Sequence, residues 1–301
     1  MNQAYIPAFT LEPTRKVAEQ PRPTGPRTPN FIADIASGRV ELPIIPKVVG
    51  LLIAALRDPE IDTRKIGEAL AQDPVLAAKV LRLANSSFFG GQRSMSSIDA
   101  AVALIGTQAL DRLVVACGVS ASLGSVPGID LPTFWRDALV AATAAHQLAA
   151  RLTVDAEAAY LCGLLHATGH LILCRTYPEI ADLVFTGFAV ARGAELAALE
   201  NDNFGIDHAS VGALWVESIG FPLPVIETIR KSAQPAADTD GPLDATLRGA
   251  CALAFSVAQA APAEAAFATL PAAVQARFPS GATDAAFTSL YDALLEAEPT
   301  F

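Results

Sequence analysis

The stretch QDPVLAAKVLRLANS, which runs from Gln72 to Ser86, carries the clearest structural signal in the chain. Asp73 is followed directly by Pro74, and this pair is typical of a helix start. The aspartate side chain can accept hydrogen bonds from the first free amides, and proline lacks the N–H that would otherwise need a partner. The stretch therefore predicts a helix from Pro74 onward. Its apolar residues recur at helical spacing, at Val75, Leu76, Val80, Leu81 and Leu83.

The segments on either side of this helix show related patterns. The sequence LPIIP at residues 42–46 precedes a broad apolar stripe at residues 48–56. Ser97 is placed to cap a later helix, and Gly106 is placed to end it. No segment shows the sustained alternation of apolar and polar residues that a strand needs. We therefore expect five or six short helices within residues 31–123.

The second half carries longer helical patterns, which a loop rich in glycine and proline separates from the first set. We predict an all-α fold, a two-lobed helical bundle. The expected helices of the second half span Pro132–Leu152, Ala156–Cys174, Pro178–Arg192, Ala194–Phe204, His208–Ile219, Pro224–Lys231, Ala245–Gln259 and Ala282–Glu298. The predicted divisions are a disordered proline-rich arm at 1–30, an N-terminal helical lobe at 31–125, a second helical lobe at 126–260 and a helical tail at 261–301.

The composition argues against several classes of protein. Hydrophobic residues make up 52% of the 301 residues, but the uncharged runs are too short and too polar for a membrane-spanning helix. The first 30 residues lack the apolar core of a secretion signal, so we expect a cytoplasmic location. Residues 126–301 hold eight basic against twenty acidic side chains, which argues against binding to nucleic acid. The four cysteines are widely spaced and form no metal-type or redox-type pair.

The chain resembles the HDOD domain family through a series of linked motifs in residues 42–106. These motifs are Leu42-Pro43-Ile44-Ile45-Pro46, Gln72-Asp73-Pro74-Val75-Leu76, Leu81-Arg82-Leu83-Ala84-Asn85-Ser86, and Ile98 through Ala101 to Ile105-Gly106. Further motifs look like landmarks of the HD phosphohydrolase superfamily: Phe134-Trp135-Arg136, Gly163-Leu164-Leu165-His166 and Gly205-Ile206-Asp207-His208. The resemblance covers about residues 31–260 and implies an HDOD-type bundle with an HD-like second lobe.

The resemblance also implies that the catalytic metal site is incomplete. HD-type enzymes hold divalent metals with His and Asp side chains, and an adjacent His-Asp pair supplies two of the ligands. This chain has His166-Ala167 instead, and alanine has no donor atom. Asp137 stands where the superfamily has its first histidine, and Lys231-Ser232 stands where cyclic-dinucleotide phosphodiesterases have a His-His pair. Near the usual final aspartate, Leu253-Ala254-Phe255 offers no carboxylate. We expect no catalytic residue, no metal and no cofactor.

Four side chains are nevertheless candidates for a vestigial metal site. His166 and His170 are four residues apart on one predicted helix, and Asp137 and His208 could approach them from other helices. The alternative is that these histidines are buried and hydrogen-bonded within the bundle.

The candidates for partner binding are Asn85, Ser86, Phe88 and Phe89, which lead into a glycine-rich loop. Aromatic residues on such loops anchor many protein interfaces. The alternative is that Asn85 and Ser86 end the helix by bonding its free carbonyls, while the phenylalanines belong to the core.

The resemblance implies a non-enzymatic bacterial signal-transduction module, near cyclic-dinucleotide pathways, whose partners are signalling proteins. The alternative is a divergent metal-dependent phosphohydrolase that acts on a nucleotide or cyclic dinucleotide and retains Fe, Mn or Zn. Binding of nucleic acid through the first lobe is a third hypothesis, against which the charge distribution argues. The sequence predicts no oligomeric state.

Overall fold

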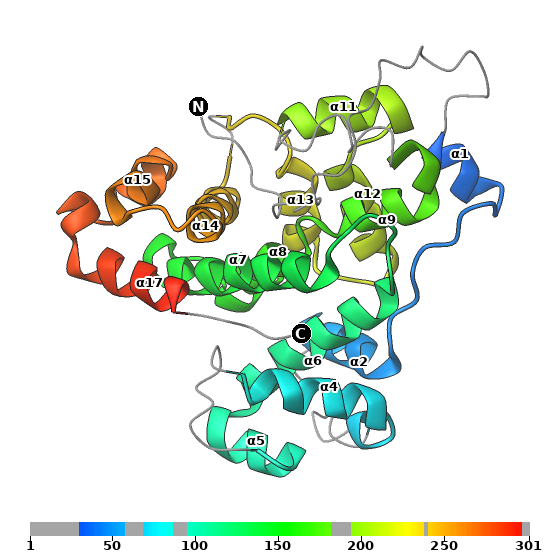
Figure 1. Cartoon of the computed structure of the whole chain (residues 1–301), viewed down its shortest axis with the longest axis horizontal. Helices are drawn as coiled ribbons and strands as arrows, with labels where there is room; N and C mark the ends of the chain where they lie inside the picture. The colour runs from blue at the N-terminus through cyan, green and yellow to red at the C-terminus, as the bar shows by residue number, and fades with distance from the viewer. Residues whose placement is uncertain (1–29, 58–68, 87–94, 182–193, 238–239, 297–301) are drawn as a thin grey trace.

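The computed structural model describes residues 30–57, 69–86, 95–181, 194–237 and 240–296. Within these ranges the secondary structure consists of α-helices and one 3-10 helix, without a strand, so the predicted all-α fold is confirmed. Most helices fall into two groups that follow one another along the chain (Figure 1). Residues 1–29 of the predicted arm lie outside the described ranges.

The helices of the first group pack around α6. They are α2 (Lys47–Arg57), α4 (Pro74–Ala84), α5 (Ile98–Ile105) and α6 (Thr107–Leu123). The predicted start of α4 is confirmed, because Oδ1 of Asp73 accepts a 2.9 Å hydrogen bond from the Leu76 amide. Ser97 caps α5 in the same way, through the Ala100 amide. Since α6 contacts α2, α4 and α5, the group shares one core.

The second group is built on α7, which packs along both α8 and α14. Its helices are α7 (Leu131–Leu152), α8 (Ala156–Leu165), α9 (Thr168–Thr176), α11 (Ala194–Phe204), α12 (His208–Ser218), α13 (Leu223–Lys231) and α14 (Pro242–Ala258). Gly163 permits the close contact of α8 with α7, because a Cβ at this position would lie 2.6 Å from the Cα of Ala142. The two backbones therefore meet without an intervening side chain.

The sequence predicted a single helix over Ala156–Cys174, and this prediction is wrong. The structure has α8 and α9, separated by a turn that contains His166 and Ala167. The hydroxyl of Thr168 donates a 2.7 Å hydrogen bond to the carbonyl of Leu165, which satisfies an acceptor at the end of α8. The turn lies at the two residues where the resemblance implies a His-Asp pair.

The first helix, α1 (Phe31–Ala36), lies against the second group although it precedes the first group in sequence (Figure 1). The Phe31 ring meets Tyr177 edge-on at 6.4 Å between centroids, and Tyr177 stacks on Phe204 of α11 at 5.9 Å. The Tyr177 hydroxyl also donates a 2.7 Å hydrogen bond to Asp34. These contacts connect the beginning of the described chain to α9 and α11.

The C-terminal tail adds short helices against α14 and α7. They are α15 (Ala263–Ala268), α16 (Ala272–Gln275), the 3-10 helix η2 (Gly281–Thr283) and α17 (Ala285–Leu295). Phe267, Phe278 and Phe287 pack edge-on against one another, with ring centroids 5.0 to 6.4 Å apart. An aromatic cluster thus gives the tail a core of its own.

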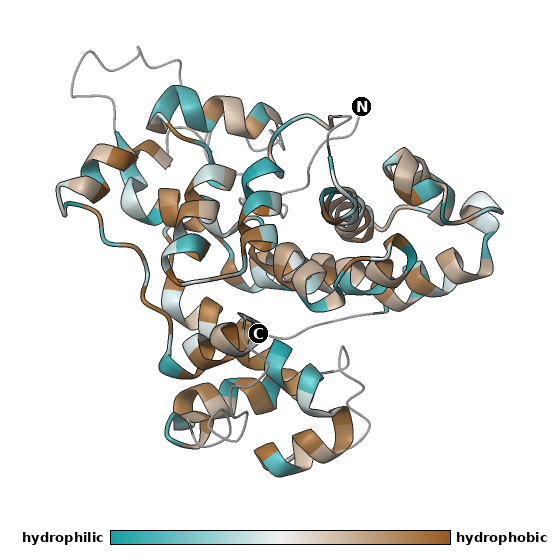
Figure 2. Ribbon diagram, turned by 180° about the vertical axis from the view of Figure 1, so that it is seen from behind, coloured by the Kyte–Doolittle hydropathy of each residue, from teal (hydrophilic) through white to brown (hydrophobic). Residues whose placement is uncertain are grey.

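Hydrophobic residues occur on helices throughout the molecule, as Figure 2 shows. Even so, none of the described helices combines the length and the apolar character that a membrane crossing requires. The 22-residue α7 is long enough, but it carries Arg136, Asp137 and Arg151. The apolar side chains of these helices are used mainly for packing between helices.

Candidate functional site

A buried carboxylate, Glu200 of α11, connects two of the histidines that the sequence singled out. Oε1 of Glu200 accepts a 2.7 Å hydrogen bond from Nδ1 of His170 in α9. Oε2 accepts hydrogen bonds from both Nδ1 and the backbone amide of His208, at the start of α12. All three side chains are buried. One carboxylate therefore ties together three helices.

The charges of Glu200 and His208 stabilise each other. Burial alone would raise the pKa of Glu200, but the charge of His208 and hydrogen bonds from both histidines lower it to about 2. Burial acts to lower the pKa of His208, and the Glu200 carboxylate outweighs this effect, so the net shift is upward from 6.5. The two side chains therefore form a buried ion pair below the raised pKa of His208.

The crossing of α9 and α12, which brings His170 and His208 together, depends on glycine. A Cβ at Gly169 would lie 1.9 Å from the carbonyl oxygen of His208 and 2.5 Å from the amide nitrogen of Gly212. No side chain fits into this space, so the two backbones make their contact next to the histidines. The position of the cluster is thus fixed by backbone packing.

Cys174, one turn after His170 in α9, extends this network. Its Sγ lies 3.5 Å from Nε2 of His170. Burial and then the charge of Glu200 raise the pKa of the Cys174 thiol well above 9.0, so the thiol keeps its proton. We therefore assign the S–H as donor to Nε2, which leaves the Nδ1–H of His170 to donate to Glu200.

The other two candidates for the vestigial metal site make different contacts. Asp137 is buried in α7, and its Oδ1 accepts hydrogen bonds of 3.0 and 2.9 Å from the guanidinium of Arg136. Nδ1 of His166 donates a 2.8 Å hydrogen bond to the carbonyl of Gly163. Across the described ranges, no group of three or more His, Cys, Asp and Glu side chains is arranged to hold a metal ion.

Sequence reasoning missed Glu200, although a signal was present. Leu196, Ala197, Glu200 and Phe204 are the buried residues of α11, and their spacing defines its inner face. A glutamate on an apolar helical face needs a partner, because an unpaired buried charge is costly. Its position could have been read from periodicity, whereas its partners could not.

A second buried carboxylate, Asp244 of α14, was also missed. Its Oδ1 accepts a 2.7 Å hydrogen bond from the Thr228 hydroxyl, and its Oδ2 pairs with Nζ of Lys231 at 3.1 Å. Lys231 occupies one of the positions where the resemblance placed a lost metal ligand. In this chain the lysine neutralises a carboxylate.

The partner-binding candidates at the end of α4 take part in internal contacts. Asn85 holds the backbone of Met95 from both sides: Nδ2 donates to its carbonyl at 2.8 Å and Oδ1 accepts from its amide at 2.6 Å. The hydroxyl of Ser86 donates to a carbonyl one turn earlier in α4. Phe88 and Phe89 lie outside the described residues. The side chains of Asn85 and Ser86 thus stabilise the first group of helices.

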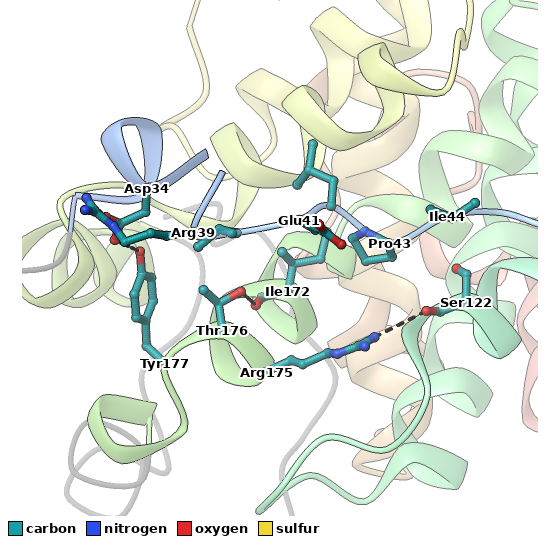
Figure 3. Close-up of a pocket in the computed structure, with 12 residues that line it drawn as sticks. Asp34, Arg39, Glu41, Pro43, Ile44, Ser122, Ile172, Arg175, Thr176 and Tyr177 are labelled. Carbon is teal, nitrogen blue, oxygen red and sulfur yellow. Dashed lines mark hydrogen bonds and ion pairs between the residues drawn. The ribbon is translucent and has the colours of Figure 1, made fainter. Parts of the chain in front are cut away.

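A cleft of about 610 Å³ lies between the segment at residues 39–44 and the ends of α6 and α9. Figure 3 shows Asp34 between Arg39 and Tyr177 at one end of it. Arg175 of α9 extends across the cleft and donates a hydrogen bond to the carbonyl of Ser122 in α6 (Figure 3). The cleft therefore lies where the two groups of helices meet.

Leu42, Pro43 and Ile44 of the LPIIP motif line this cleft, in a segment that is neither helix nor strand. The indole N–H of Trp215 in α12 donates a 2.8 Å hydrogen bond to the Pro43 carbonyl. Arg175 also donates a 3.0 Å hydrogen bond to the carbonyl of Leu123, at the end of α6. The first contact ties α12 to the segment before α2, and the second ties α9 to the end of α6.

The structure defines a class of protein: an all-helical domain related to the HD phosphohydrolases. Its features are the two helical groups, the buried histidines of α9 and α12, and the His-Ala turn before α9. The chain belongs to the HDOD family, because the HDOD domain matches residues 42–235. The match extends from the LPIIP motif to just beyond α13. It confirms the family resemblance that the sequence motifs predicted.

Solved structures share this fold. A protein from Shewanella amazonensis SB2B, whose name proposes a phosphohydrolase, is 29% identical with a TM-score of 0.69, covering 87% of this chain and 92% of that one. An HDOD domain protein of unknown function from Geobacter sulfurreducens is 21% identical with a TM-score of 0.66, covering 88% and 96%. A Marinobacter aquaeolei VT8 protein, whose name proposes a role in signal transduction, is 25% identical with a TM-score of 0.64, covering 90% and 61%.

A relative with a longer chain is an uncharacterized protein of Treponema pallidum (strain Nichols). It is 28% identical over 206 residues, which is 68% of this chain. The chain spans 40% of the length of that relative. The shared part therefore corresponds to one portion of a larger protein.

Proposed function

We propose that this chain is a regulatory signal-transduction module of the bacterial cytoplasm, which binds other proteins and does not hydrolyse phosphoesters. The observation that carries this proposal is the state of Glu200, whose two oxygens both accept hydrogen bonds from protein groups. A metal ion that recruited this carboxylate would have to break a buried ion pair with His208, which is costly.

Two further positions support the proposal. Ala167 follows His166 where an HD enzyme has an aspartate ligand, and its methyl group has no donor atom. Asp244, another buried carboxylate, is already neutralised by Lys231. The family to which the chain belongs and the name of its Marinobacter relative agree with a role in signalling.

The cleft beside residues 39–44 is the partner surface that we assign, and its occupant is an extended peptide segment of a signalling protein. Within the described part of the chain, the backbone amides at positions 41, 42, 44 and 45 make no hydrogen bond. Backbone amides that are free in this way can bond to the carbonyls of an extended peptide. Ile44 adds an apolar side chain that is 86% exposed.

Cross-linking of the tagged full chain in its native cells, followed by mass spectrometry, tests this assignment. We expect specific signalling proteins to be recovered with the parent chain and lost with Ile44→Asp. Leu223→Asp makes the same change at an apolar residue that is 67% exposed and does not line the cleft, so it should retain them. Equal recovery by the two variants would show that the cleft is not the partner surface.

Hydrolysis by a divergent metal site is the alternative function, and the name of the Shewanella relative favours it. The purified chain, supplied with Mn²⁺, Fe²⁺ or Zn²⁺ and either bis(p-nitrophenyl) phosphate or cyclic di-GMP, is expected to show no turnover above the rate in buffer. Metal-dependent turnover that His166→Ala abolishes, in a variant that still shows the helical spectrum of the parent, would refute the proposal.

A further inference from the structure

A second, smaller cavity lies apart from the cleft and from the buried histidines, between α4, α6 and the start of α7. Its volume is about 170 Å³. Lys79 and Arg82 of α4 line it, together with Cys117 and Ser120 of α6 and Trp135 of α7. No aspartate or glutamate is among the residues that form its wall.

Among the described residues, the two basic side chains have no acidic partner. Lys79 and Arg82 are three residues apart, so they project from the same face of α4. Neither makes an ion pair or a hydrogen bond within the described part of the chain. Several other cations of the described chain are paired with carboxylates: Arg39, Arg112, Arg136, Arg230, Lys231 and Arg248. Two positive charges without a counter-charge among the described residues therefore line one cavity, in a protein of net charge −10.

The cavity wall supplies neutral groups around these charges. Burial raises the pKa of the Cys117 thiol to about 12, against the opposing influence of Lys79 and Arg82, so the thiol stays uncharged. Cys117 lines the same cavity as both cations. The Ser120 hydroxyl makes no hydrogen bond with the described residues, so its proton is available to a ligand.

We propose that this cavity is a binding site for a phosphate monoester group. Two cations match the double negative charge of such a group, and a serine hydroxyl adds a neutral donor. A volume of about 170 Å³ admits a phosphate but is below the roughly 300 Å³ at which pockets for larger ligands begin, so the rest of the ligand extends into solvent. The site would let a phosphorylated molecule contact α4, α6 and α7 at once.

Calorimetric titration of the full chain at low salt tests the proposal. Inorganic phosphate, phosphoserine and AMP are used as separate ligands. We expect saturable binding, which Lys79→Gln/Arg82→Gln weakens by about tenfold or more. The matched control is Lys47→Gln/Arg277→Gln, which removes the same charge from two exposed cations elsewhere in the chain that likewise have no ion pair. This control should bind like the parent.

The three ligands also identify the source of the phosphate. Tighter binding of phosphoserine than of inorganic phosphate assigns the site to a phosphorylated protein, and tighter binding of AMP assigns it to a nucleotide. Similar binding of all three assigns it to the phosphate alone. The proposal is overturned if the parent binds none of them, or if both double variants lose affinity equally, since the latter result would reflect net charge only. Ser120→Ala leaves the charge unchanged and should weaken binding by several fold relative to the parent chain.

Discussion

Glu200 shows how one residue determines the state of a buried site. Its carboxylate receives three hydrogen bonds and carries the charge that keeps His208 protonated. Without it, two buried histidines would lose their shared acceptor. The site is therefore held together by a residue that none of the HD-type motifs includes.

Replacing this carboxylate by an amide should destabilise the fold strongly. We expect Glu200→Gln to lower the free energy of unfolding by about 3–5 kcal/mol, because it leaves a buried imidazole facing an uncharged group. Urea denaturation measures the change. Glu195→Gln, an exposed position on the same helix, is the control and should stay within about 0.5 kcal/mol of the parent. A loss for Glu200→Gln no larger than that of the control would contradict this account.

The same ion pair predicts a pH dependence. The pKa of Glu200 is about 2 in the folded state against 4.5 ordinarily, so its stabilising contribution is complete above pH 4.5 and is lost as the pH falls toward 2. The pKa of His208 is raised from 6.5, so its contribution is complete below pH 6.5 and is lost as the pH rises through the folded value. The difference in free energy of unfolding between the parent and Glu200→Gln should therefore be largest between pH 4.5 and 6.5, as measured by urea titrations. A difference that does not change with pH would contradict this prediction.

Asp111 of α6 has the opposite effect on stability. Burial, and then the charge of Glu157, raise its pKa from 3.8 to about 6. The folded state thus holds this proton more tightly than the unfolded chain does, and stability falls as the pH rises from 3.8 through 6. The carboxylate of Asp111 therefore destabilises the protein at neutral pH.

Asp111→Asn should consequently stabilise the chain at neutral pH. We expect the free energy of unfolding to rise by about 1 kcal/mol at about pH 7.5. This is less than the full pKa shift would give, because the side chain is partly solvated. Near pH 3.8 the gain should vanish, since the parent is then largely protonated. Thermal unfolding at the two pH values measures this, with Asp292→Asn on the exposed face of α17 as the control. A gain that does not change with pH would count against the mechanism.

At the scale of elements, the crossing of α9 and α12 is the contact on which the site depends. We expect Gly169→Ala to destabilise the chain by about 3 kcal/mol or more, since its methyl group would overlap the backbone of α12. Gly50→Ala is the matched control, because the nearest atom to a Cβ at that position in α2 is 3.9 Å away. The control should change stability by about 1 kcal/mol at most, in the stabilising direction. Equal melting temperatures for the two variants would refute the close contact.

Helix starts were predictable at this scale, whereas one helix break was not. Asp73 and Ser97 cap α4 and α5 as the sequence indicated, because a cap involves residues only two or three positions apart. The break between α8 and α9 was harder to predict, because the sequence there contains no proline, and the Thr168 hydroxyl that bonds the end of α8 is a weak stop signal. The turn at His166 and Ala167 arises where α9 packs against α12 at Gly169.

At the scale of the whole molecule, α1 attaches to the second group through Tyr177. Tyr177→Phe keeps the ring between Phe31 and Phe204 but removes the hydrogen bond to Asp34. We expect the free energy of unfolding to fall by about 1 kcal/mol and amide hydrogen exchange in α1 to become faster. Tyr291→Phe, which removes a hydrogen bond to Ala261 in the tail, is the control and should leave exchange in α1 unchanged. Unaltered exchange in the Tyr177 variant would contradict the attachment.

The all-α class, the family, the capped helix starts and the missing aspartate after His166 could all be read from the sequence. These features follow from residue identity and from interactions that reach at most one helical turn. The folded arrangement of the helices was needed to see that Glu200 joins His170 to His208, that Lys231 neutralises Asp244 and that α1 packs on Tyr177. These contacts join residues on different helices, and their formation depends on which helical faces can approach closely, as α9 and α12 do at Gly169.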